Sequence, residues 1–410
     1  MKINFPYTQE LIELDKIFNI HNKDNLRIVG GAVRNFLLNK KITDYDLSCK
    51  YTPDEILDIL NNNNIKALTI GKDFGTITAI INHKSFEITS TREDIQTDGR
   101  HAIVKYTNDF RIDAERRDFT FNALYLDFNN NLYDYFNGVE DLKNGIVRFI
   151  GNPEERIKED YLRILRLFRF YSLYANKIEK DAFKYSIKYK NQLSYLSGER
   201  IKSEMFKIFK SRKVFEIIDI MIDQGIMQII TGIDKFNLLN FKELNIILNN
   251  ILNNNPNSAS NHIKPEIILA ILLDNENMIY MLKEKWNLSN IECSIIKNII
   301  KYKNIDLNNS LEIQNILFDG IHKSILINIL LYQSLISNNF TDIKKKISLI
   351  KSIVKPIFPI TGNDLINIGI NDKKQYSNIL LGLKKEFILS NFLMTKDMLL
   401  SRAFVYFNKK

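Results

Sequence analysis

The sequence predicts an α+β protein, with a small mixed β-sheet domain at the N-terminal end followed by an all-helical body and tail. Between residues 26 and 149, short runs of β-branched and aromatic residues alternate with turn signals. Beyond Pro153, apolar residues recur at helical spacing almost to the end, and Gly and Pro are rare. The polar, Asn-rich stretch 249–262 has the composition of a linker. We therefore expect domains at residues 1–150, 151–247 and 263–410.

Turn signals assign the elements of the N-terminal part in order. Residues 26–29 predict a strand, a Gly-Gly turn leads into a helix at 32–39, and 44–48 predict a second strand. An Asn-His-Lys turn joins 74–81 to 86–91 and predicts a hairpin. Asn-rich and Asn-Gly turns delimit further strands at 123–128, 132–136 and 146–150.

Composition excludes several classes of protein. Hydrophobic residues make up 45% and charged residues 26% of the 410, the balance of a globular protein with a sizeable core. No apolar run approaches the roughly 20 residues of a membrane span, and residues 1–16 contain acidic side chains and no secretory core. With only Cys49 and Cys293, a disulfide framework is not expected. We therefore expect a cytoplasmic protein without a membrane partner.

Positive charge is concentrated in one stretch. The net charge is +9, and residues 151–213 contain 16 Lys and Arg against 8 Asp and Glu. Such a stretch is typical of a protein that binds a polyanion. A solvated helical surface would have the same composition, so the charge alone does not decide between these readings.

The most informative motif is a pair of carboxylates that follows a glycine turn. Asp44 and Asp46 are one residue apart, so on a strand both side chains project from the same face. Carboxylates of this kind are ligands for Mg²⁺, which also binds substrate phosphates. Gly30 and Gly31 would present backbone N–H groups to those phosphates, and Arg34 would add a guanidinium. Each motif alone is often only a turn or a cap, but together they indicate nucleotidyl transfer.

A second motif contains adjacent arginines. Arg116, Arg117 and Asp118 suit a nucleotide, because guanidinium groups bind phosphate oxygens and a carboxylate accepts from ribose hydroxyls. A surface ion pair of little energetic weight is the alternative.

A third motif lies on a predicted amphipathic helix at 159–170, with Leu162, Leu165 and Phe168 turned inward. Asp160 and Arg163 are three residues apart and would be neighbours on the helix surface. Together they would offer an acceptor and a donor that match the Watson–Crick edge of a base. A simple salt bridge is the alternative.

In order and spacing, these motifs resemble the class II tRNA nucleotidyltransferases, which comprise the CCA-adding enzymes and the related bacterial poly(A) polymerases. The resemblance runs from about residue 26 to 215. Motif A matches 29–34 with 44–46, motif B 116–120, motif C 134–142, motif D 159–169, and motif E 198–201 with Glu204; residues 86–92 and 98–101, and more faintly 358–365, also resemble the family.

The resemblance implies a polymerase-β-like nucleotidyltransferase head and a role for each matched residue. Asp44 and Asp46 would hold two Mg²⁺ ions; Gly30, Gly31 and Arg34 would hold the triphosphate; Arg116, Arg117 and Asp118 would contact sugar and phosphates; Asp160 and Arg163 would read the base, supported by Arg166 and Arg169. Glu87 is a weaker candidate for a third carboxylate, and motif E together with Asn137-Gly138 is expected to be structural.

Two departures from the family pattern limit these inferences. Asn35 stands where the family commonly has Asp, which would weaken an orienting contact to Arg34. The tail lacks the Gly-Pro pattern expected after Gly369.

The leading hypothesis is template-independent addition of C, C and A to tRNA 3′ ends from CTP and ATP, with basic helices binding the acceptor arm through its phosphates. A poly(A) polymerase and an enzyme adding only CC or only A are alternatives of the same class. A non-catalytic RNA-binding protein is the alternative of another class.

Overall fold

The structure is a computed structural model that describes residues 1–20, 23–97, 102–236, 244, 246, 264–273, 275–337 and 339–407. It divides into two compact units, Met1–Lys235 with Glu284–Asn287 (unit 1) and Phe236–Lys283 with Leu288–Lys410 (unit 2). The expected linker at 249–262 and the loop at 98–101 lie outside the described residues. The division into domains at 1–150, 151–247 and 263–410 stays a prediction.

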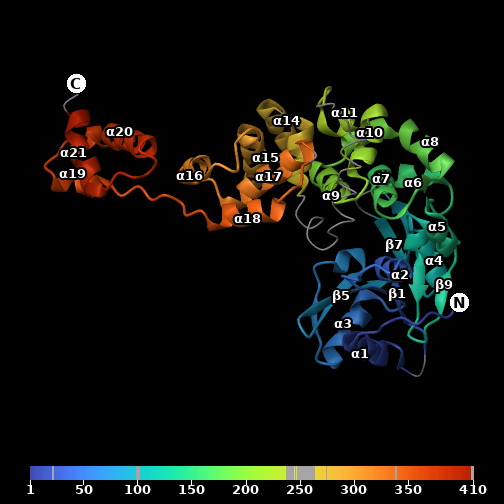
Figure 1. The fold of residues 1–410 in the computed structure, drawn as a ribbon. Helices are drawn as coiled ribbons and strands as arrows, with labels where there is room; N and C mark the ends of the chain where they lie inside the picture. Colours follow the sequence, from blue (N-terminus) through green and yellow to red (C-terminus); the bar gives the residue numbers. More distant parts are fainter. Residues whose placement is uncertain are drawn as a thin grey trace. The chain divides into compact units, whose positions relative to one another are not determined.

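Unit 1 begins with a mixed seven-stranded sheet, as expected from the sequence (Figure 1). Its order is β3 (Lys66–Leu68), β4 (Thr76–Ile81), β5 (Lys84–Ser90), β2 (Asp46–Cys49), β1 (Leu26–Val29), β8 (Leu124–Leu126) and β9 (Leu132–Asp134). The β2–β5 pair is parallel, and the other neighbours in this sheet are antiparallel.

Three helices flank the strands of this sheet: α1 (Gln9–Phe18), α2 (Gly31–Leu37) and α3 (Pro53–Asn62). Leu14 of α1 and Ile56 of α3 share one buried core with Ile28, Leu47 and Ile88 of the strands. This core fixes β1 and β2 side by side, with Gly30 directly after the end of β1 and Asp46 at the start of β2.

The predicted hairpin is confirmed by β4 and β5. Asn82 and His83, which join the two strands, have positive φ angles of 50° and 62°. A two-residue connection with positive φ at both positions matches the twist of antiparallel strands. A second hairpin, β6 (Arg92–Thr97) and β7 (Ala102–Tyr106), forms a separate two-stranded sheet.

The rest of unit 1 is largely helical, with a small parallel pair of strands, β10 (Ile146–Val147) and β11 (Lys177–Ile178). Its helices are α4 (Phe110–Glu115), α5 (Gly138–Asn144), α6 (Pro153–Glu159), α7 (Leu162–Tyr174), α8 (Lys180–Lys188), α9 (Gly198–Phe209), α10 (Val214–Asp223) and α11 (Ile226–Thr231), with 3-10 turns at Lys72–Phe74, Thr120–Asn122 and Lys190–Tyr195.

Two glycines of the family motifs permit close backbone approach. A Cβ added at Gly138 would lie 2.3 Å from the Thr120 carbonyl oxygen, and one at Gly198 would lie 2.2 Å from that of Lys285. Beside Gly198, the buried indole of Trp286 donates to the Ile230 carbonyl at 2.7 Å. The structural role expected for these parts of motifs C and E agrees with this packing.

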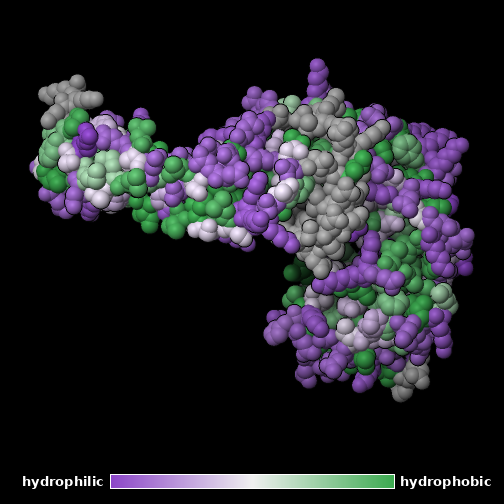
Figure 2. All heavy atoms as spheres, in the orientation of Figure 1, coloured by the Kyte–Doolittle hydropathy of each residue, from purple (hydrophilic) through white to green (hydrophobic). Residues whose placement is uncertain are grey.

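The helices from residue 265 onward are α13 (Pro265–Leu273), α14 (Glu276–Trp286), α15 (Asn290–Tyr302), α16 (Ser310–Phe318), α17 (Lys323–Ser337), α18 (Ile343–Ser352), α19 (Gly362–Asn367), α20 (Tyr376–Leu389) and α21 (Lys396–Phe407), with a 3-10 turn at Lys373–Gln375. Helices α19, α20 and α21 share a core that includes Leu365, Leu383 and Leu399. Figure 2 shows both hydrophobic and hydrophilic surface over these C-terminal helices. Among the helices described, none is long and apolar enough to span a membrane.

Candidate active site

All of the site residues expected from the sequence line one cavity of about 780 Å³ within unit 1. The lining consists of Gly30, Gly31, Arg34, Asp44, Asp46, Arg116, Arg117, Asp118, Asn122, Asp160, Leu162, Arg163, Arg166, Arg169, Phe170, Leu173, Tyr174, Arg200 and Lys207. Residues more than 170 positions apart in the chain are thus brought to one place, on a wall dominated by guanidinium groups.

The carboxylate pair lies where β2 begins. The strand starts at Asp46, so the expectation of a strand from residue 44 is wrong: Asp44 precedes it, outside the β1–β2 ladder. Asp46 pairs with Val29, the last residue of β1, which places the turn at Gly30 beside the carboxylate. Partial burial raises the pKa of Asp46, and Arg117 opposes this shift while the charge of Asp44 adds to it.

The glycine turn is tied to motif B. Gly30 has a φ of 68°, and a Cβ there would lie 3.3 Å from the Asn122 carbonyl oxygen. Arg34 is buried and donates to Asn122 Oδ1, to the Tyr174 hydroxyl at 3.1 Å and to Asn35 Oδ1 at 3.3 Å. Burial lowers the pKa of Arg34. The orienting contact from position 35 is therefore present, as a hydrogen bond to a neutral amide.

Arg116 and Arg117 share one buried carboxylate, Asp113 of α4. Arg116 Nε donates to Asp113 Oδ1 at 2.8 Å, and Arg117 Nη2 lies 3.3 Å from Oδ2. Arg117 Nε also donates to the Tyr125 hydroxyl at 2.9 Å. Burial alone would lower the pKa of Arg117, but Tyr125 and Asp113 outweigh it and raise the pKa.

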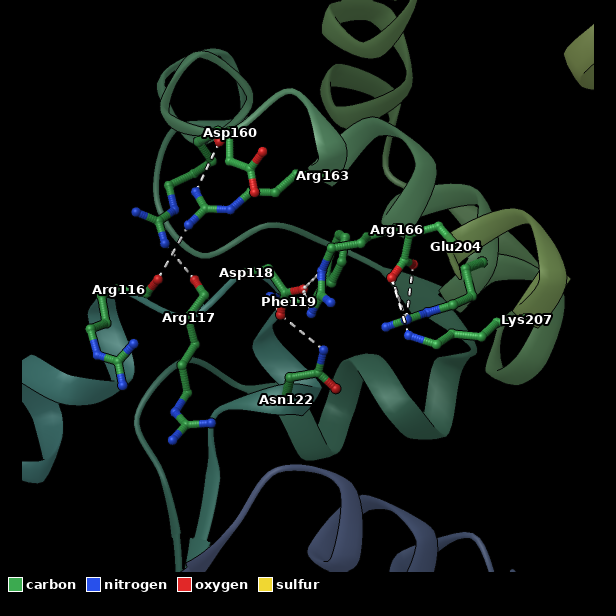
Figure 3. A network of polar contacts seen from close by, with 12 residues as sticks. Arg116, Arg117, Asp118, Phe119, Asn122, Asp160, Arg163, Arg166, Glu204 and Lys207 are labelled. Carbon is green, nitrogen blue, oxygen red and sulfur yellow. Dashed lines mark hydrogen bonds and ion pairs between the residues drawn. The ribbon is translucent and has the colours of Figure 1, made fainter. Parts of the chain in front are cut away.

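Asp118 is engaged by protein groups on both oxygens (Figure 3). Oδ1 accepts from the Phe119 backbone N–H and from Asn122 Nδ2, both at 2.9 Å, and Oδ2 accepts from Arg166 Nε at 2.7 Å. Burial would raise the pKa of Asp118, but the charge of Arg166 and the hydrogen bonds from Arg166 and Asn122 together outweigh burial and lower the pKa. Asp118 and Arg166 thus join motif B to α7.

Asp160 and Arg163, the pair expected to read the base, do not lie on one helix, which corrects an expectation from the sequence. Helix α6 ends at Glu159 and α7 begins at Leu162, so Asp160 lies between two helices in extended conformation. Its Oδ1 accepts from the Leu162 N–H at 3.0 Å and its Oδ2 from Arg200 Nη2 at 2.7 Å. The inward positions of Leu162, Leu165 and Phe168 are confirmed, since all three are buried.

Arg163 is held by a different set of groups from those that hold Asp160. Its Nη1 donates to the Arg156 carbonyl at 2.8 Å and to the Glu159 carboxylate, and its Nη2 reaches the Arg116 carbonyl at 3.4 Å. Asp160 and Arg163 both still face the cavity. The break between α6 and α7, rather than a shared helix face, brings acceptor and donor to the site.

Motif E contributes both a brace and a cavity residue. Glu204 of α9 forms a buried ion pair with Arg169 of α7 at 2.9 Å, and Lys207 lies 3.4 Å from the same carboxylate. Burial lowers the pKa of Arg169 to about 10. Arg200, expected to be structural, lines the cavity and holds Asp160.

The cavity also contains residues that the sequence did not place in the site, namely Asn122, Leu162, Phe170, Leu173, Tyr174, Arg200 and Lys207. Asn122 could have been found from the sequence, because it follows Asp118 by four residues and lies two positions beyond motif B. Tyr174 and Lys207 carry no comparable sequence signal.

Glu87 lies opposite Asp46 in the parallel β2–β5 pair and is exposed. Within the described residues, however, no group of three or more Asp, Glu, His or Cys side chains is placed to hold a metal ion. The pair Asp44 and Asp46 therefore remains the candidate set of metal ligands, without Glu87.

Two family models match the chain. The model described as "Poly A polymerase head domain" matches residues 26–148, which carry the glycine turn, the carboxylate pair and motif B. The model described as "Probable RNA and SrmB- binding site of polymerase A" matches residues 177–233, which contain Arg200 and Glu204.

Some relatives match over nearly the whole length of the chain, and others over about half of it. The chain is 33% identical over 408 residues to "CCA tRNA nucleotidyltransferase 1, mitochondrial" of Danio rerio, covering 96% of this chain and 90% of that protein. It is 38% identical over 195 residues to the "CCA-adding enzyme" of Staphylococcus epidermidis, covering 47% and 48%. A crystal structure of the Bacillus stearothermophilus CCA-adding enzyme in complex with CTP has the same fold, with a TM-score of 0.77 and 19% identity over 97% of this chain and 98% of that one. The chain belongs to the CCA tRNA nucleotidyltransferase family.

Proposed function

We propose that this protein adds C, C and A to tRNA 3′ ends without a nucleic-acid template, using CTP and ATP and releasing pyrophosphate. In each step the RNA 3′ oxygen forms a bond to the α-phosphorus, the bond from that phosphorus to the β-phosphate bridge breaks, and the hydroxyl proton is lost to solvent. Membership of the family carries the assignment. The convergence of both carboxylates and the arginines of motifs A, B and D on one cavity supports it.

Asp44 and Asp46 fit divalent metal ions, and we propose Mg²⁺. Both carboxylates line the cavity, and oxygen ligands of this kind suit a hard cation that also binds substrate phosphates. Burial raises the pKa of Asp46 and the charge of Asp44 adds to this shift, so a cation bound by the two carboxylates would stabilise their ionised forms. When bound, the cations lower the pKa of the RNA 3′-hydroxyl and neutralise the leaving pyrophosphate.

Arg34, Arg116 and Arg117 are the proposed donors to the triphosphate, with Gly30 and Gly31 allowing it close to the backbone. Guanidinium groups bind phosphate oxygens through paired, charge-assisted hydrogen bonds. All three arginines are tied to neighbouring side chains before any nucleotide binds, so little rotamer freedom remains to be lost on binding.

Asp160 and Arg163 are the proposed readers of the base, with Asp160 accepting from an exocyclic amine and Arg163 donating to a ring nitrogen or carbonyl. Cytosine and adenine both carry an amine on the Watson–Crick edge, where uracil carries a carbonyl. A wrong base would leave a partly buried polar group unpaired, which costs about 1–3 kcal/mol. Arg200, which bonds to Asp160, holds the acceptor in place.

Asp118, Arg166 and Arg169 have a supporting part in this proposal. Asp118 holds Asn122 and Arg166, and Asn122 in turn holds Arg34. A ribose hydroxyl that contacts Asp118 would add to these bonds, because a carboxylate oxygen can accept more than one donor.

The helices from residue 151 are proposed to bind the tRNA acceptor arm. Lys and Arg outnumber Asp and Glu by 16 to 8 between residues 151 and 213, and lysines on exposed helices bind phosphates without reading sequence.

We further propose that the protein acts in the cytoplasm. Cys49 is a buried free thiol, which agrees with a reducing compartment. The matched vertebrate relatives are named as mitochondrial, and fractionation of cells tests the location.

The decisive experiment offers Mg²⁺ and a tRNA ending at the discriminator base, with CTP, ATP or both, and resolves products at single-nucleotide length. Two additions with CTP alone, and three with both, are expected. A long ladder with ATP would instead indicate a poly(A) polymerase, addition of only CC or only A would indicate a partial enzyme, and no product would favour an RNA-binding protein.

Asp44→Ala should abolish incorporation while tRNA affinity stays within a few-fold of wild type. The exposed α3 variant Asp58→Ala is the matched control and should remain active.

A further inference from the structure

Asp113, on the short helix α4, is a buried carboxylate that does not line the cavity. Its side chain is 1% exposed, yet it accepts hydrogen bonds from several elements of unit 1. Ser48 Oγ lies 3.1 Å from Oδ2 and the Tyr125 hydroxyl 2.6 Å from the same oxygen. Arg116 and Arg117 contact Oδ1 and Oδ2 respectively.

These contacts fix two long side chains that end in the cavity. A free arginine side chain has considerable rotamer entropy, which it loses when a ligand orders it. Arg117 is held twice, because its Nε donates to the Tyr125 hydroxyl while that hydroxyl donates to Asp113. Asp113, Tyr125 and Arg117 thus form a closed triangle that leaves the guanidinium only one arrangement.

Asp113 also ties these arginines to the strand of the carboxylate pair. Ser48 follows Asp46 by two residues on β2, so their side chains lie on the same face of the strand. The backbone N–H of Arg92, where β6 begins, lies 3.4 Å from Asp113 Oδ1. One carboxylate therefore meets β2, β6, β8 and the end of α4.

We propose that Asp113 is a positioning residue for the nucleotide, which sets Arg116 and Arg117 at a fixed place relative to Asp46 so that they receive the phosphate chain. The proposal rests on the proposed function of the cavity, and it adds Asp113, a residue that the sequence analysis did not single out.

Electrostatics agree with this geometry. Burial would raise the pKa of Asp113, but the charges of Arg116 and Arg117 outweigh it and lower the pKa to about 2. The group is therefore an anion throughout the neutral range. Buried ion pairs add little net stability compared with apolar packing, so placement of the two guanidinium groups is the better explanation of this cluster.

The test replaces Asp113 by Asn in the full chain, which keeps the shape and removes the charge. KM and kcat for CTP are measured with a fixed tRNA, along with the inhibition constant of cytidine, which carries no phosphate. We expect KM for CTP to rise about tenfold or more and kcat to change less, while the cytidine constant stays within about twofold. Asp109→Asn is the control: Asp109 caps the same helix, and Asn caps as well as Asp.

Three outcomes would contradict the proposal: unchanged kinetics in Asp113→Asn, an equal loss for CTP and cytidine, or the same loss in Asp109→Asn. Should Asp113→Asn not fold, Tyr125→Phe removes one side of the triangle and keeps the packing, and it should raise KM for CTP about threefold with the cytidine constant unchanged. An unaltered KM in that variant would equally overturn the proposal. A wild-type protein that incorporates no nucleotide would refute the proposed function itself, so the two failures are distinguishable.

Discussion

The buried ion pair between Arg169 and Glu204 gives a quantitative prediction. The two side chains are 9% and 4% exposed, and they join α7, which carries Arg163, the proposed reader of the base, to α9 of motif E. Burial and the neighbouring charge of Arg166 already lower the pKa of Arg169 to about 10. In the variant Glu204→Gln, the guanidinium would stay buried beside Arg166 without its counter-charge.

The expected loss follows from the desolvation of the remaining charge. Removing one partner of a buried pair costs about 3–5 kcal/mol. For a cooperative unit of this size, each kcal/mol lowers the melting temperature by roughly 2–4 °C, so the expected fall is about 6–20 °C. The amide oxygen of Gln can still accept one hydrogen bond from Arg169, which places the result toward the lower end of that range.

Urea and thermal unfolding of the full chain measure this loss. Glu155→Gln is the matched control, because Glu155 is an exposed residue of α6, and its free energy of unfolding should change by less than about 0.5 kcal/mol. Replacing both partners by Met removes both charges and should recover most of the loss. If Glu204→Gln lies within about 1 kcal/mol of wild type, or if the double variant is less stable than either single one, the reasoning is wrong.

Three further predictions concern the cavity and its support. Burial raises the pKa of Asp46, so the folded protein loses stability as the pH rises through the pKa of this carboxyl group. Without metal, Asp46→Asn should therefore melt at or above the wild-type temperature. Added Mg²⁺ should raise the melting temperature of the wild type but not that of the variant. Arg163→Ala should reduce the preference in kcat/KM for CTP and ATP over UTP and GTP by about tenfold, and unaltered ratios among the four nucleotides would refute its base-reading role. Gly138→Ala should lose at least about 1–3 kcal/mol in urea unfolding, since the new Cβ would meet the Thr120 carbonyl; Gly362→Ala, with no atom nearer than 3.6 Å, is the control.

The local sequence pattern was enough to predict several strands and turns of the N-terminal head domain. The strand at 26–29 and the hairpin of β4 and β5 follow from alternation and turn residues, which act over a few positions. The order and spacing of the motifs identified the cavity residues, because a metal site, a triphosphate site and a base-reading site must be close in space. Asp44, the turn at Gly30 and Arg116 could all be selected in this way.

Helical periodicity misplaced Asp160. The run at 159–170 has apolar residues at helical spacing, and Leu162, Leu165 and Phe168 are indeed buried. The pattern cannot show that the chain breaks at Asp160, because both α6 and α7 keep the same period on either side. At the break, Asp160 is held both locally, by the Leu162 N–H, and by Arg200, 40 positions further along the chain.

The sequence by itself determined the class of the fold, the strands and turns of the head, and which residue types carry the chemistry, since these depend on local conformation and on short spacings. Tertiary structure alone decided how those residues are held. Asp113 meets Ser48 across 65 positions, Arg34 meets Tyr174 across 140, and Arg169 meets Glu204 across 35. No period in the sequence encodes such pairs, because each depends on how separate elements pack, and packing decides which buried charge finds a partner.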